Sequence, residues 1–302
     1  MRKIITIGES VLDTLYEGGR PVKAFVGGRI ACAAATLGAI GHNVAMVSEC
    51  ATDRVGDLVI DFLERHNVDT HSIDRYTDGT TPLAAIFANE GDRRDTIVNY
   101  GRYPADRFDV IWPRIDENDI VLFGSLYAID TPQRERLFEL VTYAAQRKAI
   151  LLYLPGFQHG INFRITRVMP AILENLEIAD LVIAHDRDLH DIFPGESPEE
   201  AFHNHIEYYG DSYLHITAGL DVTLMRRGEQ LTATTQGTTD NLLGWQAGFT
   251  AGVIDRLISR DIDRDALRHL APEQWRDIIA QACDIAAQCA AGDDNALDTL
   301  PR

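Results

Sequence analysis

The chain has 302 residues, of which 45% are hydrophobic, and its formal net charge at pH 7 is −18. This apolar content suits one large α/β domain, and the negative surface argues against nucleic acid or an anionic membrane as the main partner. There is no apolar run of membrane-spanning length and no metal-binding or redox spacing among the four cysteines, so we expect a cytoplasmic protein with reduced thiols.

Apolar runs of strand length alternate with segments of helical period along the chain, a pattern typical of βαβ units and a mostly parallel sheet. Core strands are expected at residues 4–8, 44–48, 120–123, 150–153, 181–184 and 213–217. Helices are expected at residues 30–40, 56–65, 132–147, 201–209, 241–259 and 275–291. Right-handed crossovers would place these helices on both faces of the sheet.

Two half-polar stretches, about 11–25 and 81–100, do not follow this alternation and are expected to form a small projecting sheet. The first contains Asp13, which follows a strand that ends in Gly8. A carboxylate there can accept two hydrogen bonds from a diol, whereas the simpler role is that of a turn aspartate.

Gly27 and Gly28 precede a helix rich in small residues, and Cys32 lies in its first turns. We expect the glycines to allow close backbone packing at this helix start. Arg29 follows them directly, and the expectation is a solvated side chain, with a contact to an anion or a carboxylate as the alternative.

Near the C-terminus, Gly244, Gly248 and Gly252 recur every four residues and therefore share one face of a predicted helix. Because glycine has no Cβ, that face can pack close to a neighbouring backbone. Asp240 precedes this helix, and capping its N-terminus is the simplest role for such a residue.

These motifs together resemble the two signatures of the PfkB/ribokinase family of sugar kinases. In the second signature, Gly248, Phe249 and Gly252 match, but Leu243 occupies the position of the family's catalytic base. The resemblance implies a ribokinase-like three-layer α/β/α sandwich, with a mostly parallel central sheet, as a single domain over 1–302. Residues 11–25 and 81–100 would form its small β lid, through which a homodimer is expected.

The family activity is ATP-dependent phosphoryl transfer to a hydroxyl of a carbohydrate or nucleoside, with Mg²⁺. The resemblance implies substrate contacts from Asp13, Gly27, Gly28 and Cys32, the last replacing an asparagine. It implies nucleotide contacts from Thr217, Gly219, Asn241 and Gly244. Asp188 would organise Mg²⁺ through water, while His185 and its acidic neighbours lack the spacing of a zinc site and predict a polar helix start.

The departures from the family pattern concentrate at polar positions, namely Cys32, Leu154, Gly156, His185 and 241–243. Leucine can neither accept a proton nor bind a cation, so Asp240 is the remaining candidate base. Two hypotheses follow. The chain is a sugar kinase homologue of weak or altered activity, or it is a pseudokinase that binds a small metabolite without catalysis.

Overall fold

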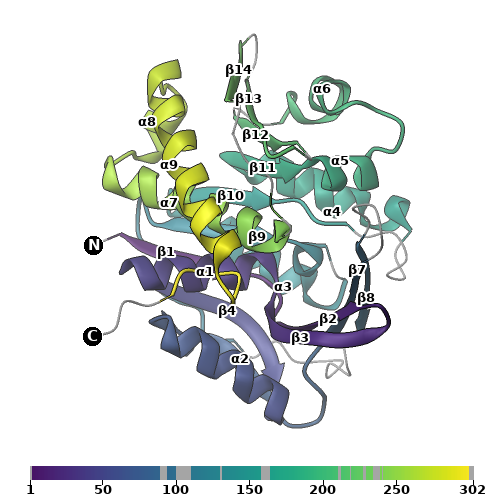
Figure 1. The fold of residues 1–302 in the computed structure, drawn as a ribbon. Coiled ribbons are helices and arrows are strands. Elements are labelled where there is room, and N and C mark those ends of the chain that lie inside the picture. Colours follow the sequence, from purple (N-terminus) through teal and green to yellow (C-terminus); the bar gives the residue numbers. More distant parts are fainter. Residues whose placement is uncertain are drawn as a thin grey trace.

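The computed structural model describes residues 2–88, 94–99, 110–129, 131–157, 164–209, 212–217, 219–226, 229–233, 239 and 241–298. Within these ranges the largest sheet has a parallel centre made of β1 (Lys3–Ile7), β4 (Asn43–Ala51), β9 (Ile120–Gly124), β10 (Ile150–Leu154), β11 (Leu181–His185) and β12 (Tyr213–Ile216). Its margins are β5 (Val68–Asp69), β6 (Ile73–Tyr76), β13 (Val222–Arg226) and β14 (Glu229–Ala233). The order is β14-β13-β12-β11-β10-β9-β1-β4-β5, with β6 also beside β4 (Figure 1).

Helices cover both faces of this sheet, as the alternation of strands and helices predicts. One face packs against α1 (Arg29–Ile40), α2 (Arg54–Arg65), α7 (Leu242–Ser259) and α9 (Pro272–Ala291). The other packs against α3 (Thr131–Gln146), α4 (Ile165–Ile178) and α5 (Asp186–Ile192). Successive residues of one strand point to opposite faces, so Ile4 joins the first core and Ile5 the second. β9, β10 and β11 are buried throughout, as parallel strands covered on both faces should be.

A second sheet lies beside the first and consists of β2 (Val11–Glu17), β3 (Arg20–Gly27), β7 (Leu83–Ala88) and β8 (Arg94–Asn99) (Figure 1). Its order is β3-β2-β7-β8, with β2 and β7 parallel in the middle and antiparallel partners outside. The two half-polar stretches of the sequence supply these four strands.

The glycine face of α7 packs against α9, which confirms the close approach that its spacing predicts. A Cβ on Gly248 would lie 2.8 Å from Ala286 Cα and 2.8 Å from the Cys289 side chain. A Cβ on Gly252 would lie 2.5 Å from Ala282 Cα. The two helix backbones therefore touch where no side chain separates them.

Some helices differ from the sequence prediction. The helix expected at 201–209 is a short α6 (Pro198–Ala201) that continues as a π-helical turn, Phe202–Ile206. Helix α4 was not predicted, because Pro170 in its interior is a residue that normally ends a helix. The charged stretch 261–273 contains a short helix, α8 (Arg264–Leu267).

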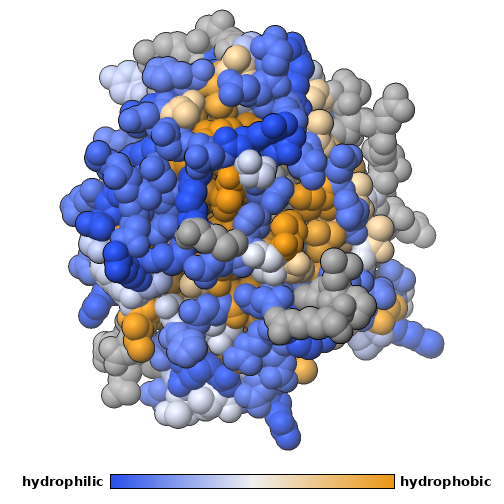
Figure 2. All heavy atoms as spheres, turned by 90° about the vertical axis from the view of Figure 1, so that its left-hand side faces the viewer, coloured by the Kyte–Doolittle hydropathy of each residue, from blue (hydrophilic) through white to orange (hydrophobic). Residues whose placement is uncertain are grey.

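Polar side chains dominate one face of the molecule (Figure 2). The face on the left of Figure 1 is mostly hydrophilic, with smaller apolar areas between the polar side chains (Figure 2). Among the described helices, none combines the length and the apolar character needed to cross a bilayer.

Candidate functional site

A cavity of about 220 Å³ opens at the carboxyl ends of the parallel strands. Glu9 follows β1, Ser125 follows β9, Gly156 follows β10, and His185 ends β11; all four line the cavity. The chain leaves β1 toward β4 on one side, whereas β9 pairs with β1 on the other. Open α/β sheets bind ligands at such a reversal of strand order.

The second sheet and helix α7 complete the cavity wall. Strand β2 contributes Val11 and Asp13, and strand β7 contributes Ala84 and Ile86. A further part of the wall is the start of α7, from which Leu242, Leu243 and Gln246 line the cavity. Leu243 thus presents an apolar side chain to the cavity from the position at which the family pattern has its base.

Asp13 fits into the cavity wall because Gly27, on the paired strand opposite it, has no side chain. It is 5% exposed. A Cβ on Gly27, in the paired strand β3, would lie 1.9 Å from Asp13 Oδ2. Burial, and next the charge of Glu9, raise the pKa of Asp13 to about 7. The carboxyl group is therefore balanced between its neutral and ionised forms near neutral pH.

Glu9 is a second carboxyl group in the same cavity, and it had no sequence prediction. Burial raises the pKa of Glu9 above its usual range, although N–H groups including that of Tyr127 oppose the rise. Gly28 lines the cavity beside it, and a Cβ there would lie 3.0 Å from the Glu9 carbonyl oxygen. With φ at 90°, residue 28 also has a backbone conformation that favours glycine.

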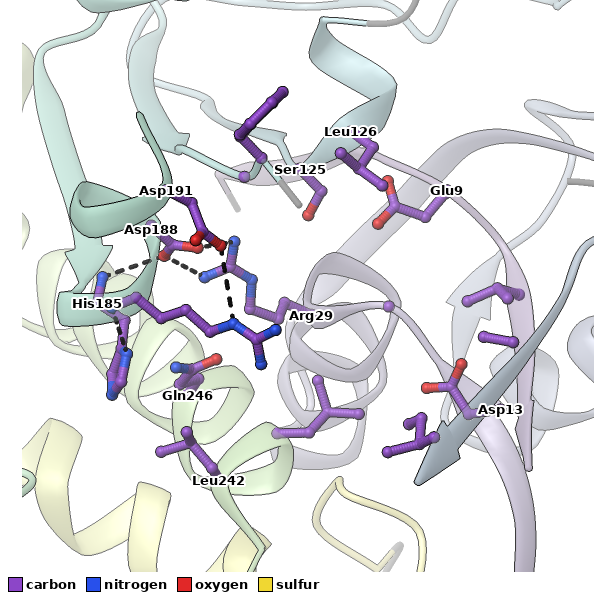
Figure 3. A pocket seen from close by; sticks show the side chains of 18 of the residues that line it. Glu9, Asp13, Arg29, Ser125, Leu126, His185, Asp188, Asp191, Leu242 and Gln246 are labelled. Carbon is purple, nitrogen blue, oxygen red and sulfur yellow. Dashed lines mark hydrogen bonds and ion pairs between the residues drawn. The ribbon is translucent and has the colours of Figure 1, made fainter. Parts of the chain in front are cut away.

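Arg29 and Asp188 form an ion pair at the opposite end of the cavity from Asp13 (Figure 3). Arg29 Nη1 donates to Asp188 Oδ2 at 2.7 Å, and Nη2 donates to Oδ1 at 3.2 Å and to the Pro155 carbonyl oxygen at 2.6 Å. Only 15% of the Arg29 side chain is exposed, so the expectation of a solvated arginine is wrong. Burial alone would lower the pKa of Arg29, but Asp188 and Glu9 outweigh it and raise the pKa.

His185 caps helix α5, which confirms the predicted polar helix start. Its Nδ1 accepts a hydrogen bond from the Arg187 backbone N–H at 3.2 Å, and the backbone N–H of His185 donates to Asp188 Oδ2 at 3.1 Å. Burial lowers the pKa of His185, so the ring is neutral and carries its proton on Nε2. Within the described residues this buried Nε2 has no hydrogen-bond partner.

The residues predicted to organise Mg²⁺ do not fit the ion. Both oxygens of Asp188 accept hydrogen bonds from the Arg29 guanidinium, which places a positive charge where the cation would be needed. In the described part of the chain, no three His, Cys, Asp or Glu side chains are arranged to hold a metal ion.

The predicted substrate residues separate into two groups. Asp13 and Gly28 line the cavity, and Gly27 leaves the space that the Asp13 carboxylate fills. Asp188, the predicted Mg²⁺ residue, also lines the cavity. Cys32 is fully buried in the core, its thiol donates to the Val26 carbonyl oxygen at 3.5 Å, and burial raises its pKa. Asp240 lies outside the described residues.

The predicted nucleotide residues lie outside the cavity lining. Thr217 and Gly219 belong to a turn in which Thr217 Oγ1 accepts the Asp221 N–H at 3.0 Å. Asn241 caps α7 by accepting the Gly244 N–H at 3.2 Å, and its side chain donates to the Ala290 carbonyl oxygen. A Cβ on Gly244 would lie 2.8 Å from the Cys289 carbonyl oxygen, so this glycine serves the contact of α7 with α9.

Sequence reasoning did not identify Glu9 or Gln246 as site residues, and it assigned Arg29 to solvent. One signal was available for Glu9, since it comes directly after the first parallel strand, where α/β proteins place ligand-binding groups. Gln246 had no comparable signal, because an amide in a helix is ordinarily a surface residue.

Known proteins resemble this chain along most of its length. Residues 1–231 match the model of the pfkB family carbohydrate kinases. An ATP-dependent 6-phosphofructokinase of Thermoanaerobacterium thermosaccharolyticum is 21% identical over 242 residues, which are 75% of this chain and 72% of that protein.

Solved structures of similar fold cover nearly the whole chain. A fructokinase double mutant from Vibrio cholerae O395, bound to fructose, ADP and potassium ion, superposes with a TM-score of 0.84 at 14% identity and covers 99% of this chain and 95% of its own. The aminoimidazole riboside kinase of Salmonella enterica, complexed with aminoimidazole riboside and an ATP analogue, gives a TM-score of 0.81 at 14% identity. The superposition covers 99% of this chain and 96% of that kinase. These likenesses confirm the predicted ribokinase-like α/β fold.

Proposed function

The chain belongs to the pfkB family of carbohydrate kinases, and from this premise we propose that its cavity binds a small sugar or nucleoside without transferring phosphate to it. The observation that carries the proposal is the wall at the start of α7, where Leu242 and Leu243 face the cavity. Phosphoryl transfer to a hydroxyl needs a group that accepts its proton, and a leucine side chain has none.

The cavity lining suits a polyhydroxylated ligand. Asp13 and Glu9 offer carboxyl oxygens to hydroxyl groups, and Ser125 and Gln246 add further polar atoms. Apolar side chains such as Ile86 supply the surface against which the C–H face of a sugar packs. A volume of about 220 Å³ lies below the roughly 300–1,000 Å³ of drug-sized sites, which favours a small ligand.

The four-stranded sheet would act as the lid over this ligand within a single domain. It contributes Asp13 from β2 and Ile86 from β7, so its position decides whether the cavity is open or closed. The outer strands β3 and β8 have one paired side each among the described strands. Because such edges can pair with another chain, a homodimer through the lid is part of the proposal.

Thermal unfolding with a panel of monosaccharides and nucleosides tests this function. At least one compound should raise the melting temperature without ATP, because a ligand that binds only the folded state stabilises it. The Asp13→Ala variant should lose the shift. ADP release, measured in the presence of the same compound with ATP and Mg²⁺, should not exceed the release without it. Compound-dependent ADP release would contradict the proposal.

The second candidate function is ATP-dependent phosphorylation with Asp240 as the base. Its support is the sequence proximity of Asp240 to Leu242, two residues further on, which lines the cavity. ATP would bind near Thr217, Gly219, Asn241 and Gly244. Participation of Asp188 with Mg²⁺ would require Arg29 to leave the carboxylate. The Asp240→Asn variant decides this candidate, since it should abolish turnover while the melting temperature stays unchanged.

A further inference from the structure

We infer that Arg29 takes the place of a divalent cation beside Asp188, so that the cavity excludes such a cation and receives its ligand free of metal. The claim that a divalent cation is excluded is argued from the ion pair between Arg29 and Asp188. The claim that the ligand binds without metal rests in addition on the proposed function.

The acceptor oxygens of Asp188 are occupied. Oδ2 accepts from Arg29 Nη1 at 2.7 Å and from the His185 N–H at 3.1 Å, and Oδ1 accepts from Arg29 Nη2 at 3.2 Å. The side chains are largely buried, with 15% of Arg29 and 12% of Asp188 exposed. A cation that approached this carboxylate would have to displace a two-pronged guanidinium contact and would be repelled by it in a poorly screened site.

The surroundings are shaped for the guanidinium. Its Nη2 also donates to the Pro155 carbonyl oxygen at 2.6 Å, which fixes the plane of the group. A Cβ on Gly156 would lie 3.2 Å from Nη2 and 2.7 Å from Ser125 Cα. Residue 156 therefore has no room for a side chain, chiefly because the Ser125 backbone lies so close. Gly156, where the family pattern has a polar residue, thus leaves the space next to Arg29 Nη2 free of a side chain.

The other carboxyl groups of the cavity do not restore a metal site. Asp191 lies 3.7 Å from the Arg187 guanidinium at the cavity rim. Glu9 accepts the Tyr127 N–H at 3.3 Å, and Glu9 and Asp13 lie away from Asp188 on the other side of the cavity (Figure 3). In the described part of the chain, the Asp188 carboxylate therefore pairs with Arg29, and it belongs to no cluster of three or more acidic, His or Cys side chains that could hold a metal ion.

Titration with Mn²⁺, followed by electron paramagnetic resonance of the free ion, tests the exclusion in the full chain. The wild type and Asp188→Asn should bind Mn²⁺ equally, through the acidic surface only. Arg29→Met should bind at least about tenfold more tightly, because it leaves the Asp188 charge uncompensated. The double variant Arg29→Met/Asp188→Asn should return to the wild-type curve.

Arg54→Met is the matched control, because Arg54 also begins a helix but has a side chain that is 98% exposed. It should leave Mn²⁺ binding unchanged. Wild-type binding that Asp188→Asn abolishes would overturn the inference, and so would a folded Arg29→Met variant without the gain. If Arg29→Met does not fold, the comparison of wild type with Asp188→Asn still decides. None of these results depends on whether a sugar binds, so failure of the proposed function is recognised separately.

Discussion

The carboxylate of Asp13 occupies the space that any side chain at residue 27 would need, since a Cβ on Gly27 would come within 1.9 Å of Asp13 Oδ2. The two residues lie on the paired strands β2 and β3, close to where the second sheet meets the cavity. Gly27 is therefore the residue that lets a buried carboxyl group face the ligand space.

Replacing Gly27 by alanine should destabilise the fold and displace Asp13. Forcing a methyl group into an occupied site costs about 1–3 kcal/mol, and urea unfolding measures it. Gly219→Ala is the stability control, because a Cβ there would lie 3.7 Å from Thr217 Oγ1, an ordinary contact. Equal unfolding midpoints for the two variants would show that the Asp13 carboxylate is not held by Gly27.

Asp13 should make the protein less stable as the pH rises through the neutral range. In the folded protein its pKa of about 7 lies above the ordinary aspartate value of 3.8, so unfolding releases a proton at pH values between the two. The contribution of Asp13 to the unfolding free energy thus falls by at most about 4 kcal/mol between about pH 4 and about pH 7. Above about pH 7 it no longer changes with pH.

The Asp13→Asn variant isolates this contribution, because the amide does not titrate. Its stability relative to the wild type, taken as the difference in the free energy of unfolding, should be higher at pH 8 than at pH 5, with both proteins measured in urea at each pH. A difference between the two proteins that stays constant over this range would rule out a raised pKa for Asp13.

Gly248→Ala should separate helices α7 and α9. Alanine favours an isolated helix by about 1 kcal/mol over glycine, but here its Cβ would lie 2.8 Å from Ala286 Cα and 2.8 Å from the Cys289 side chain. The clash should outweigh the propensity and give a net loss of about 1–3 kcal/mol in urea unfolding. Ser259→Ala, at the exposed end of the same helix, should have little effect. A Gly248→Ala protein as stable as the wild type would mean that the helix contact is loose.

Asp53 should matter more than an ordinary helix cap, because it also ties α2 to the segment before β7. Its Oδ1 accepts the Gly56 N–H at 2.8 Å and the Thr81 hydroxyl at 2.7 Å, and Oδ2 accepts the Thr81 N–H at 2.8 Å. Asp53→Ala should cost roughly 2–3 kcal/mol, measured by urea unfolding.

Asp263→Ala is the comparison for Asp53, since Asp263 caps α8 through one contact, to the Ala266 N–H at 2.7 Å. It should cost about 1 kcal/mol or less. If the two substitutions cost the same, the link between α2 and Thr81 adds nothing to stability.

The α/β class, the parallel core strands and the close-packing face of α7 could all be predicted from local patterns in the chain. These features depend on the local period of apolar residues and on glycine spacing, which are visible within a few turns of chain. The leucine at the position of the family's base was also visible there, since Leu243 stands within the second signature. Helix α4 was not predicted, because proline normally interrupts a helix and the tertiary packing that accommodates Pro170 cannot be read from the sequence.

The contacts of the polar residues follow from the folded arrangement and not from any local pattern. Arg29 and Asp188 are 159 positions apart, and no local pattern relates them or brings Gly156 against the Ser125 backbone. The pKa of Asp13 depends likewise on burial and on Glu9, and Asn241 and Gly244 acquire their contacts from α9. Ion pairing, desolvation and steric exclusion are set by distances between residues remote in sequence, so they arise only when the chain has folded.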